Sequence, residues 1–332
     1  MACGMPLLPT PLLAAITSLA CLTACSSPET LRQAESLRLP AVQGGFDLMA
    51  TDVEGRRLFV NAEDNGTTEV IDLRTWTHLR TLGGMHEPKW AVYRPELAKL
   101  YVSNGDGLVK VFDSKTLAFD HELRFKDKAN NLRFEETSHE LFVGVGKTSG
   151  AIAVVDAKSD QVKYEVPLAN FPKQFEVDGD LIYVNVPAAS HVAVLSRKAR
   201  AVIATWPIAG GGNIPMGMDR EHHRLFVGCA SGKILVIDTT NAKTVAEIPI
   251  AEDPDGVSYD AKRRRVYVSC GAGMIEVIAQ QSSDRYARLA SIPTAKGAAT
   301  SIYSVELDRL FVAIPGAQGR AAEIRSYVPI SE

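Results

Sequence analysis

Residues 225–238 read LFVGCASGKILVID, and this stretch decides the fold. An apolar segment with a central aromatic residue, Leu225-Phe226-Val227, precedes a turn at Ser231-Gly232 and a second apolar segment that ends at Asp238. Short runs of β-branched and aromatic residues bounded by Gly and Ser are typical of strands joined by a hairpin. The stretch therefore predicts two neighbouring antiparallel strands.

The same pattern occurs seven times along the chain. Its aromatic residue stands at positions 59, 101, 142, 183, 226, 267 and 311, with spacings of 41 to 44 residues. A period of this length, with four short strands per repeat, is typical of one blade of a β-propeller. We predict an all-β fold over residues 36–330: a seven-bladed β-propeller with four-stranded antiparallel blades.

Proline marks the fourth strand of several repeats, as in Val166-Pro167 and Ile248-Pro249. Because proline cannot donate a ladder hydrogen bond, it belongs on the outer edge of a sheet. The last repeat has a third strand at about residues 322–328 but no fourth strand after it. Residues 37–41, Leu-Arg-Leu-Pro-Ala, carry the missing pattern near the N-terminus. We therefore expect this N-terminal strand to complete the last blade and close the ring.

Two sets of repeated polar residues have structural explanations. Asp72, Asp113 and Asp156 each end a third strand, with Thr or Ser three residues later, and such carboxylates stabilise turns by accepting backbone hydrogen bonds. Cys229 and Cys270 occupy the same position in two blades, and blade rotation does not let both side chains face each other. We expect turn-forming aspartates and two buried free thiols, with no catalytic residue among them.

The N-terminal segment predicts export. Residues 1–24 contain no charged side chain and end in Leu-Thr-Ala before Cys25, which resembles the lipobox of bacterial lipoproteins. This resemblance implies a lipoprotein-type signal peptide over 1–24, lipidation of Cys25, and a tether over 25–35. Ser26 after the cysteine implies sorting to the outer membrane of a Gram-negative bacterium, facing the periplasm. An ordinary cleaved signal or a disordered tail is the alternative.

The aromatic-Val strand, the third strand ending in Asp and the 42-residue period resemble the YVTN-repeat family, of the YncE-like type. The resemblance covers residues 36–330 and implies the propeller fold more strongly than any function. Relatives of this architecture include binding proteins, surface-layer proteins and the propeller domains of haem and quinone enzymes. The chain has no Cys-x-x-Cys-His for covalent haem attachment, and we predict no cofactor.

Propeller ligands usually bind at the mouth of the central channel, where loops lead into the first strand of each blade. The residue twelve positions before each aromatic, or ten in the fourth repeat, is mostly polar in this chain. Convergent polar groups around a concavity are the default candidate for a binding site. The candidates are the polar residues at these equivalent positions and their neighbours: Asp47, His86, Lys89, Trp90, Asn130, Asn131, Arg133, Lys173 and Asp255. A solvated ring of loops with no ligand is the alternative.

Composition and the absence of motifs limit the functions. The chain has 332 residues, a formal net charge of −3 and no long Lys/Arg run, which argues against nucleic-acid binding. No metal-ligand spacing, nucleophile elbow or phosphate loop occurs. We predict a monomeric, non-enzymatic scaffold, membrane-associated only through its lipid, that binds a partner protein, a peptide or a small anionic ligand. One alternative is a propeller hydrolase or lactonase with a metal or an Asp/His pair, such as Asp255 with His86, at the mouth. A component of a periplasmic redox or metal-handling system is the third, by family analogy.

Overall fold

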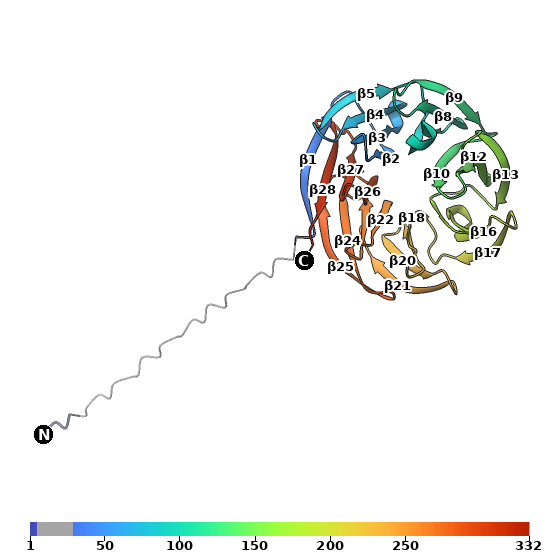
Figure 1. The fold of residues 1–332 in the computed structure, drawn as a ribbon. Helices are drawn as coiled ribbons and strands as arrows, with labels where there is room; N and C mark the ends of the chain where they lie inside the picture. Colours follow the sequence, from blue (N-terminus) through green and yellow to red (C-terminus); the bar gives the residue numbers. More distant parts are fainter. Residues whose placement is uncertain (5–28, 332) are drawn as a thin grey trace.

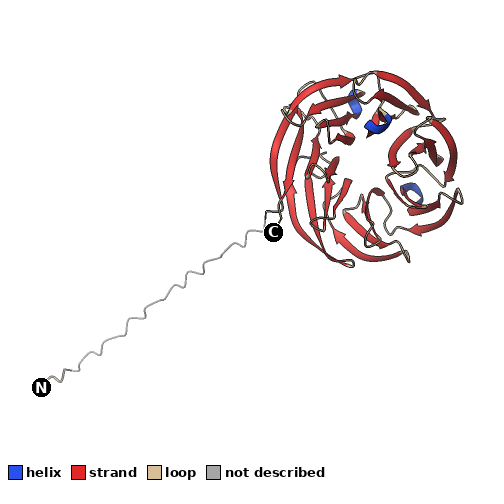
Figure 2. Cartoon of the chain, in the orientation of Figure 1, coloured by secondary structure: helices blue, strands red, loops and turns tan. Residues whose placement is uncertain are grey.

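A computed structural model describes residues 1–4 and 29–331, and seven four-stranded antiparallel sheets surround a central opening (Figure 1). Strands occupy most of the ring, as Figure 2 shows. The described helical segments are three short 3₁₀ turns, η1 (Glu63–Asn65), η2 (Pro95–Leu97) and η3 (Pro187–Ala189). The prediction of a seven-bladed β-propeller is confirmed.

In the first six blades the strands follow chain order from the centre of the ring to its rim (Figure 1). Blade 1 consists of β2 (Asp47–Asp52), β3 (Arg57–Ala62), β4 (Thr67–Asp72) and β5 (Thr77–Leu82). Blade 2 consists of β6 (Pro88–Arg94), β7 (Lys99–Asn104), β8 (Leu108–Asp113) and β9 (Phe119–Arg124). Blade 3 consists of β10 (Ala129–Glu135), β11 (Glu140–Gly146), β12 (Gly150–Asp156) and β13 (Gln161–Leu168). Blade 4 consists of β14 (Phe175–Asp178), β15 (Leu181–Val186), β16 (His191–Ser196) and β17 (Ala201–Pro207). Blade 5 consists of β18 (Asn213–Asp219), β19 (Arg224–Cys229), β20 (Lys233–Asp238) and β21 (Lys243–Pro249). Blade 6 consists of β22 (Pro254–Asp260), β23 (Arg265–Cys270), β24 (Met274–Ser282) and β25 (Arg285–Pro293).

The seventh blade joins the two ends of the chain. It contains β26 (Ser301–Ser304), β27 (Arg309–Ile314) and β28 (Ala322–Pro329), and β1 (Leu31–Leu39) pairs with β28 as the outermost strand. Closure by the N-terminal strand is confirmed, but the predicted bounds of that strand were wrong. Because β28 extends to Pro329, it offers pairing partners back to Leu31. The strand therefore begins within the segment 25–35 that was expected to be a tether, and Pro40 follows it in a turn.

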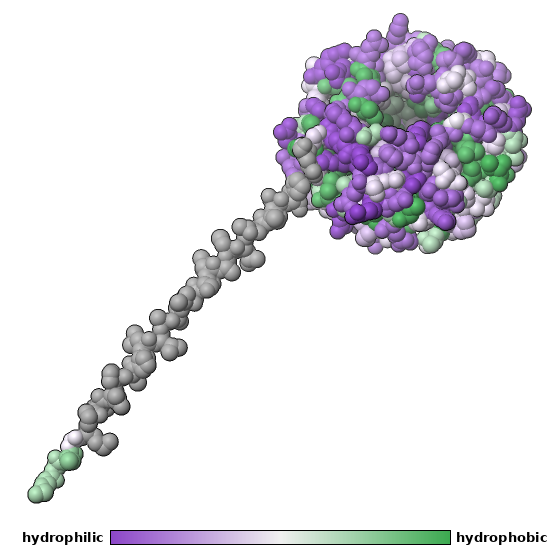
Figure 3. Space-filling view, turned by 60° about the horizontal axis from the view of Figure 1, so that its bottom comes forward, coloured by the Kyte–Doolittle hydropathy of each residue, from purple (hydrophilic) through white to green (hydrophobic). Residues whose placement is uncertain are grey.

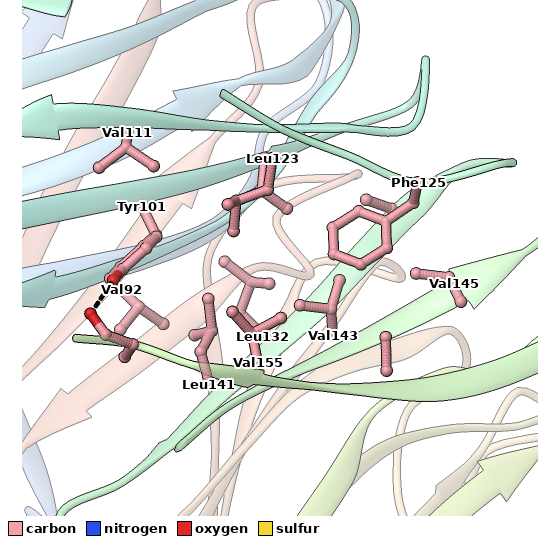
Figure 4. Packing of buried hydrophobic residues seen from close by; sticks show 14 of the residues in the cluster. Val92, Tyr101, Val111, Leu123, Phe125, Leu132, Leu141, Val143, Val145 and Val155 are labelled. Carbon is pink, nitrogen blue, oxygen red and sulfur yellow. Dashed lines mark hydrogen bonds between the residues drawn. The ribbon is translucent and has the colours of Figure 1, made fainter. Parts of the chain in front are cut away.

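The core lies between neighbouring blades. The seven repeated aromatic residues are all buried, because each second strand is covered by the sheets on both sides. Between blades 2 and 3, Tyr101 packs with Leu132 and Val143 (Figure 4). The hydroxyl of Tyr101 donates a hydrogen bond to the carbonyl of Ala157 in the next blade, at 3.1 Å. Burial of these side chains supplies most of the driving force that holds the sheets together.

The repeated aspartates and the two cysteines have the structural roles expected of them. Asp72 Oδ1 accepts the backbone N–H of Thr75 at 3.2 Å, and Asp113 Oδ1 accepts that of Thr116 at 2.7 Å. Cys229 and Cys270 are buried free thiols. Burial raises the pKa of the Cys270 thiol to about 12, which keeps it protonated and unreactive.

The first strand of every blade faces the central channel, and all seven run in the same direction along it (Figure 1). Their first residues therefore gather at one end of the channel, which we call the upper mouth, and their last residues at the lower mouth. These strands approach closely: a Cβ on Gly217 would lie 2.9 Å from Cγ1 of Val257 in the next blade. Glycine at this position lets the ring close tightly around the channel.

Residues 5–24 of the predicted signal peptide lie outside the described residues, as does Cys25, so the structure does not test this prediction. Within residues 1–4 and 29–331, the structure contains no helix long and apolar enough to span a bilayer.

Candidate functional site

The central hollow of the ring is visible in the space-filling view (Figure 3). At the upper mouth it contains a small polar cavity of about 170 Å³, the upper cavity. The cavity is lined by residues at or near the start of six inner strands and by one turn: Asp47, Leu48, Glu63, Lys89, Lys128, Asn130, Asn131, Lys173, Gln174, Ile214 and Asp255. Six of the nine candidate residues therefore converge on one space, as ring symmetry predicted.

The other three candidates do not line the upper cavity. Trp90 and Arg133 line a second space farther along the channel, the lower pocket, because side chains alternate along a strand and Arg133 lies late in β10. His86 is exposed in the loop before β6, where its carbonyl accepts the backbone N–H of Gly105 at 2.8 Å. It lines neither space, so the alternative pairing of His86 with Asp255 has no geometric support.

Lys89 is the most buried charged side chain of the upper cavity. It is 5% exposed and pairs with Glu63 of η1, while its Nζ lies 3.3 Å from Glu87 Oε2 and 4.0 Å from Asp47 Oδ2. Burial is the main cause that lowers the pKa of Lys89 to about 8. The charge of Lys89 is already compensated within the protein, so this lysine is a weak candidate for capturing an anion.

Asp47 and Asp255 form the acidic side of the cavity. Burial raises the pKa of Asp47 to about 7, with a further contribution from the negative charge of Asp255. Burial likewise raises the pKa of Asp255 to about 6, and nearby Asp253 adds to the effect. In both carboxyl groups the loss of solvation outweighs the attraction of Lys89 and Lys173. The pair therefore changes its protonation close to neutral pH.

Two donors of the upper cavity are unused in the described part of the chain. Asn131 is 3% exposed, and its Nδ2 has no hydrogen-bond partner. Lys173 has no carboxylate within 4.0 Å among those residues: its Nζ lies 5.8 Å from the ring centroid of Phe171 and attracts Asp47 and Asp255 only at longer range. A buried unsatisfied donor such as Asn131 Nδ2 is costly, so an acceptor that reached it would be stabilised.

The floor of the upper cavity is Gln174, which sequence reasoning missed. Its Nε2 donates to the carbonyl of Asp255 at 2.7 Å, and its Oε1 accepts the backbone N–H of Met216 at 3.2 Å. The amide thus reaches from blade 4 across to blade 6 and separates the upper cavity from the lower pocket, both of which it lines. Glu63 was missed as well, because it lies in the turn between the second and third strands of blade 1, whereas the prediction considered only the positions near the start of each first strand.

The upper cavity is lined by a restricted set of side chains. They include no Cys, His, Ser, Thr or Tyr, and their titratable groups are lysines and carboxylic acids. The described residues contain no group of three or more His, Cys, Asp or Glu arranged to hold a metal ion. Three carboxyl and three ammonium groups line the space, which is formally neutral when all are charged.

Comparisons with known proteins establish the fold and leave the function open. No family model matches the chain, and a search of curated proteins found no match. Among solved structures, a chain of the mitotic checkpoint complex aligns with a TM-score of 0.76 at 13% identity, covering 99% of both chains. The WD40 repeats of RRP9 align with a TM-score of 0.76 at 9% identity, covering 92% of this chain and 98% of that one. A chain of hydrazine synthase from Kuenenia stuttgartiensis aligns with a TM-score of 0.72 at 16% identity, covering 87% and 96%.

Proposed function

We propose that this protein is a non-enzymatic binding scaffold that captures a peptide or a partner protein at its upper mouth, through a carboxylate inserted into the upper cavity. The amide N–H of Asn131, which has no hydrogen-bond partner, and the ammonium group of Lys173, which makes no close ion pair, carry this proposal, since a carboxylate is the acceptor that both groups favour.

The size of the upper cavity indicates what kind of molecule enters it. Sites that enclose a whole drug-sized ligand usually measure about 300–1,000 Å³. The upper cavity, at about 170 Å³, has room for one side chain or one chain end of a larger molecule. A C-terminal carboxylate or an acidic side chain of a peptide fits this size, with the rest of the partner resting on the surrounding loops.

The fold neighbours are compatible with this function but do not decide it. One neighbour is a chain of the mitotic checkpoint complex, whereas another is a chain of hydrazine synthase. The repeated aromatic-Val strand supports a relationship to the YVTN-repeat family, whose members include binding proteins. The upper cavity is therefore the feature that supports binding.

A peptide-capture experiment tests the proposal. A pool of peptides derived from envelope proteins is offered in two forms, with free and with amidated C-termini. We expect the wild-type protein to retain peptides with a free carboxylate, and Lys173→Gln combined with Asn131→Leu to lose them. Lys126→Gln, which removes an exposed lysine that does not line the cavity, is the matched control. Equal retention by wild type and the double variant would contradict the proposal.

We also propose that the scaffold is a lipoprotein of the outer membrane, anchored through Cys25 and facing the periplasm. The lipobox-like ending of the leader supports this assignment. A tether that leads into β1 would leave the protein from the rim of blade 7 and keep both channel mouths uncovered. Incorporation of an alkyne fatty acid, followed by membrane fractionation, tests it. Cys25→Ala should abolish labelling and Cys21→Ala should not; labelling that survives Cys25→Ala refutes lipidation at that residue.

A further inference from the structure

The lower pocket has a different shape and chemistry from the upper cavity. It measures about 330 Å³, which lies in the range that encloses a whole small molecule. Its lining comes mainly from the inner strands on the other side of Gln174, and Leu48 and Gln174 line both spaces. The two spaces are therefore separate candidates, and the lower one does not depend on the function proposed for the upper one.

One wall of the lower pocket carries a row of linked charges. The guanidinium of Arg133 lies over the ring of Trp90, 4.1 Å from its centroid, and donates to Glu176 Oε1 at 3.3 Å. Arg220 donates to the other oxygen of Glu176, at 2.8 Å. Because two arginines share one carboxylate, the row keeps a net charge of +1. The side chains of Arg133 and Glu176 are largely buried, 19% and 13% exposed, and they hold Arg220, which is 52% exposed, at the edge of the pocket.

The opposite wall is mainly apolar, although Ser258 and Ser301 also line it. Leu48, Val257 and Ile302 come from the inner strands of blades 1, 6 and 7. Tyr259 and Tyr303 also line this wall, but their hydroxyls are engaged elsewhere, with Gln280 and with Asp308. These tyrosines therefore add ring carbons rather than free hydroxyl groups to the lining.

We propose that the lower pocket binds a small amphipathic monoanion: a carboxylate or sulfonate joined to an aromatic ring or a short apolar chain. The anionic group lies against Arg220 and Arg133, and the apolar body lies against Leu48, Val257 and Ile302. Such a ligand offsets the uncompensated charge of the row and removes the apolar wall from water at the same time. A neutral or cationic molecule of the same shape gains the second effect alone.

Calorimetric titration with 1-naphthylacetate tests the proposal, with its primary amide and 1-naphthylmethylamine as charge controls. We expect the carboxylate to bind at least about tenfold more tightly than the amide, and the amine to bind most weakly. Arg220→Gln, which leaves Arg133 paired with Glu176 and the row neutral, should weaken carboxylate binding about tenfold and bring it to the level of the amide. Arg94→Gln is the matched control, because Arg94 pairs with Glu136 and does not line the pocket.

Two further variants locate the bound probe. Ile302→Glu places a negative charge on the apolar wall and should abolish binding, with thermal unfolding measured to show that the ring remains folded. Lys173→Gln changes the upper cavity alone and should leave the affinity for 1-naphthylacetate unchanged. Absence of binding at about 1 mM, equal affinity for carboxylate and amide, or a loss caused by Lys173→Gln instead of Arg220→Gln would each overturn the proposal.

Discussion

Replacing Asp47 with asparagine should stabilise the protein at alkaline pH and leave it nearly unchanged at acidic pH. The native carboxyl group is held among residues that disfavour its ionised form, because burial and Asp255 raise its pKa from 3.8 to about 7. An amide of the same shape needs no ionisation. Lys89 keeps Glu63 and Glu87 as partners in this variant, so no cation is left unpaired.

The size and sign of the effect follow from the change in pKa. A carboxyl group with a raised native pKa contributes stability that is present below its unfolded pKa and is lost as the pH rises through the native value. The loss in the wild type therefore develops between about pH 4 and pH 7. A change from 3.8 to about 7 corresponds to at most about 4 kcal/mol. Because part of the shift belongs to the interaction with Asp255, we expect Asp47→Asn to gain about 2 kcal/mol above pH 7.

Urea unfolding of the wild type and Asp47→Asn, measured at about pH 4.5 and pH 8, gives the comparison directly. Asp106→Asn removes one carboxylate from an exposed turn and controls for the change in net charge. The expected result is a gain in the free energy of unfolding that is small at the lower pH and full at the higher one. A gain that is equal at both pH values, or a loss at pH 8, would refute the reasoning.

Two further predictions concern the core and the closure of the ring. In the native protein the thiols of Cys229 and Cys270 should not react with a disulfide reagent at pH 8, because both are buried. Both should react once the unreduced protein is denatured, because both are free. Immediate reaction of these thiols in the native protein would contradict their burial. Leu39 lies in the closing strand and is 4% exposed, so Leu39→Ala should lower the free energy of unfolding by about 2–3 kcal/mol. Gln33 is exposed in the same strand, so Gln33→Ala should change this free energy by less than about 0.5 kcal/mol. Equal effects of these two substitutions in urea unfolding would show that β1 does not seal the core.

The fold could be predicted from the sequence because its deciding pattern is local and repeated. Each aromatic residue at the centre of a second strand is buried by the same pair of neighbouring sheets, so one pattern returns in every blade. The bounds of β1 could not be predicted in this way. The partners of Leu31 and Gln33 are Pro329 and Tyr327 in β28. The length of β1 therefore depends on how far β28 extends, which residues near the N-terminus do not indicate.

The upper cavity was predictable to the extent that ring symmetry determines it. Equivalent positions before each inner strand gather at one mouth, which is why Asp47, Lys173 and Asp255 converge. Symmetry gives no information about links between blades that are not neighbours. Gln174 reaches from blade 4 to blade 6, and this contact depends on the actual width of the channel.

The pairing of β1 with β28 also determines the order in which the chain can fold. Glu35 and Ser326 are 291 residues apart along the chain, and joining such distant segments first would cost about 5 kcal/mol of chain entropy. Once the intervening blades have assembled around the channel, their curvature brings the two strands together and this cost largely disappears. β1, the first strand of the propeller to be synthesised, is therefore the last to find its partner, and until then one edge of β28 stays open to any other strand.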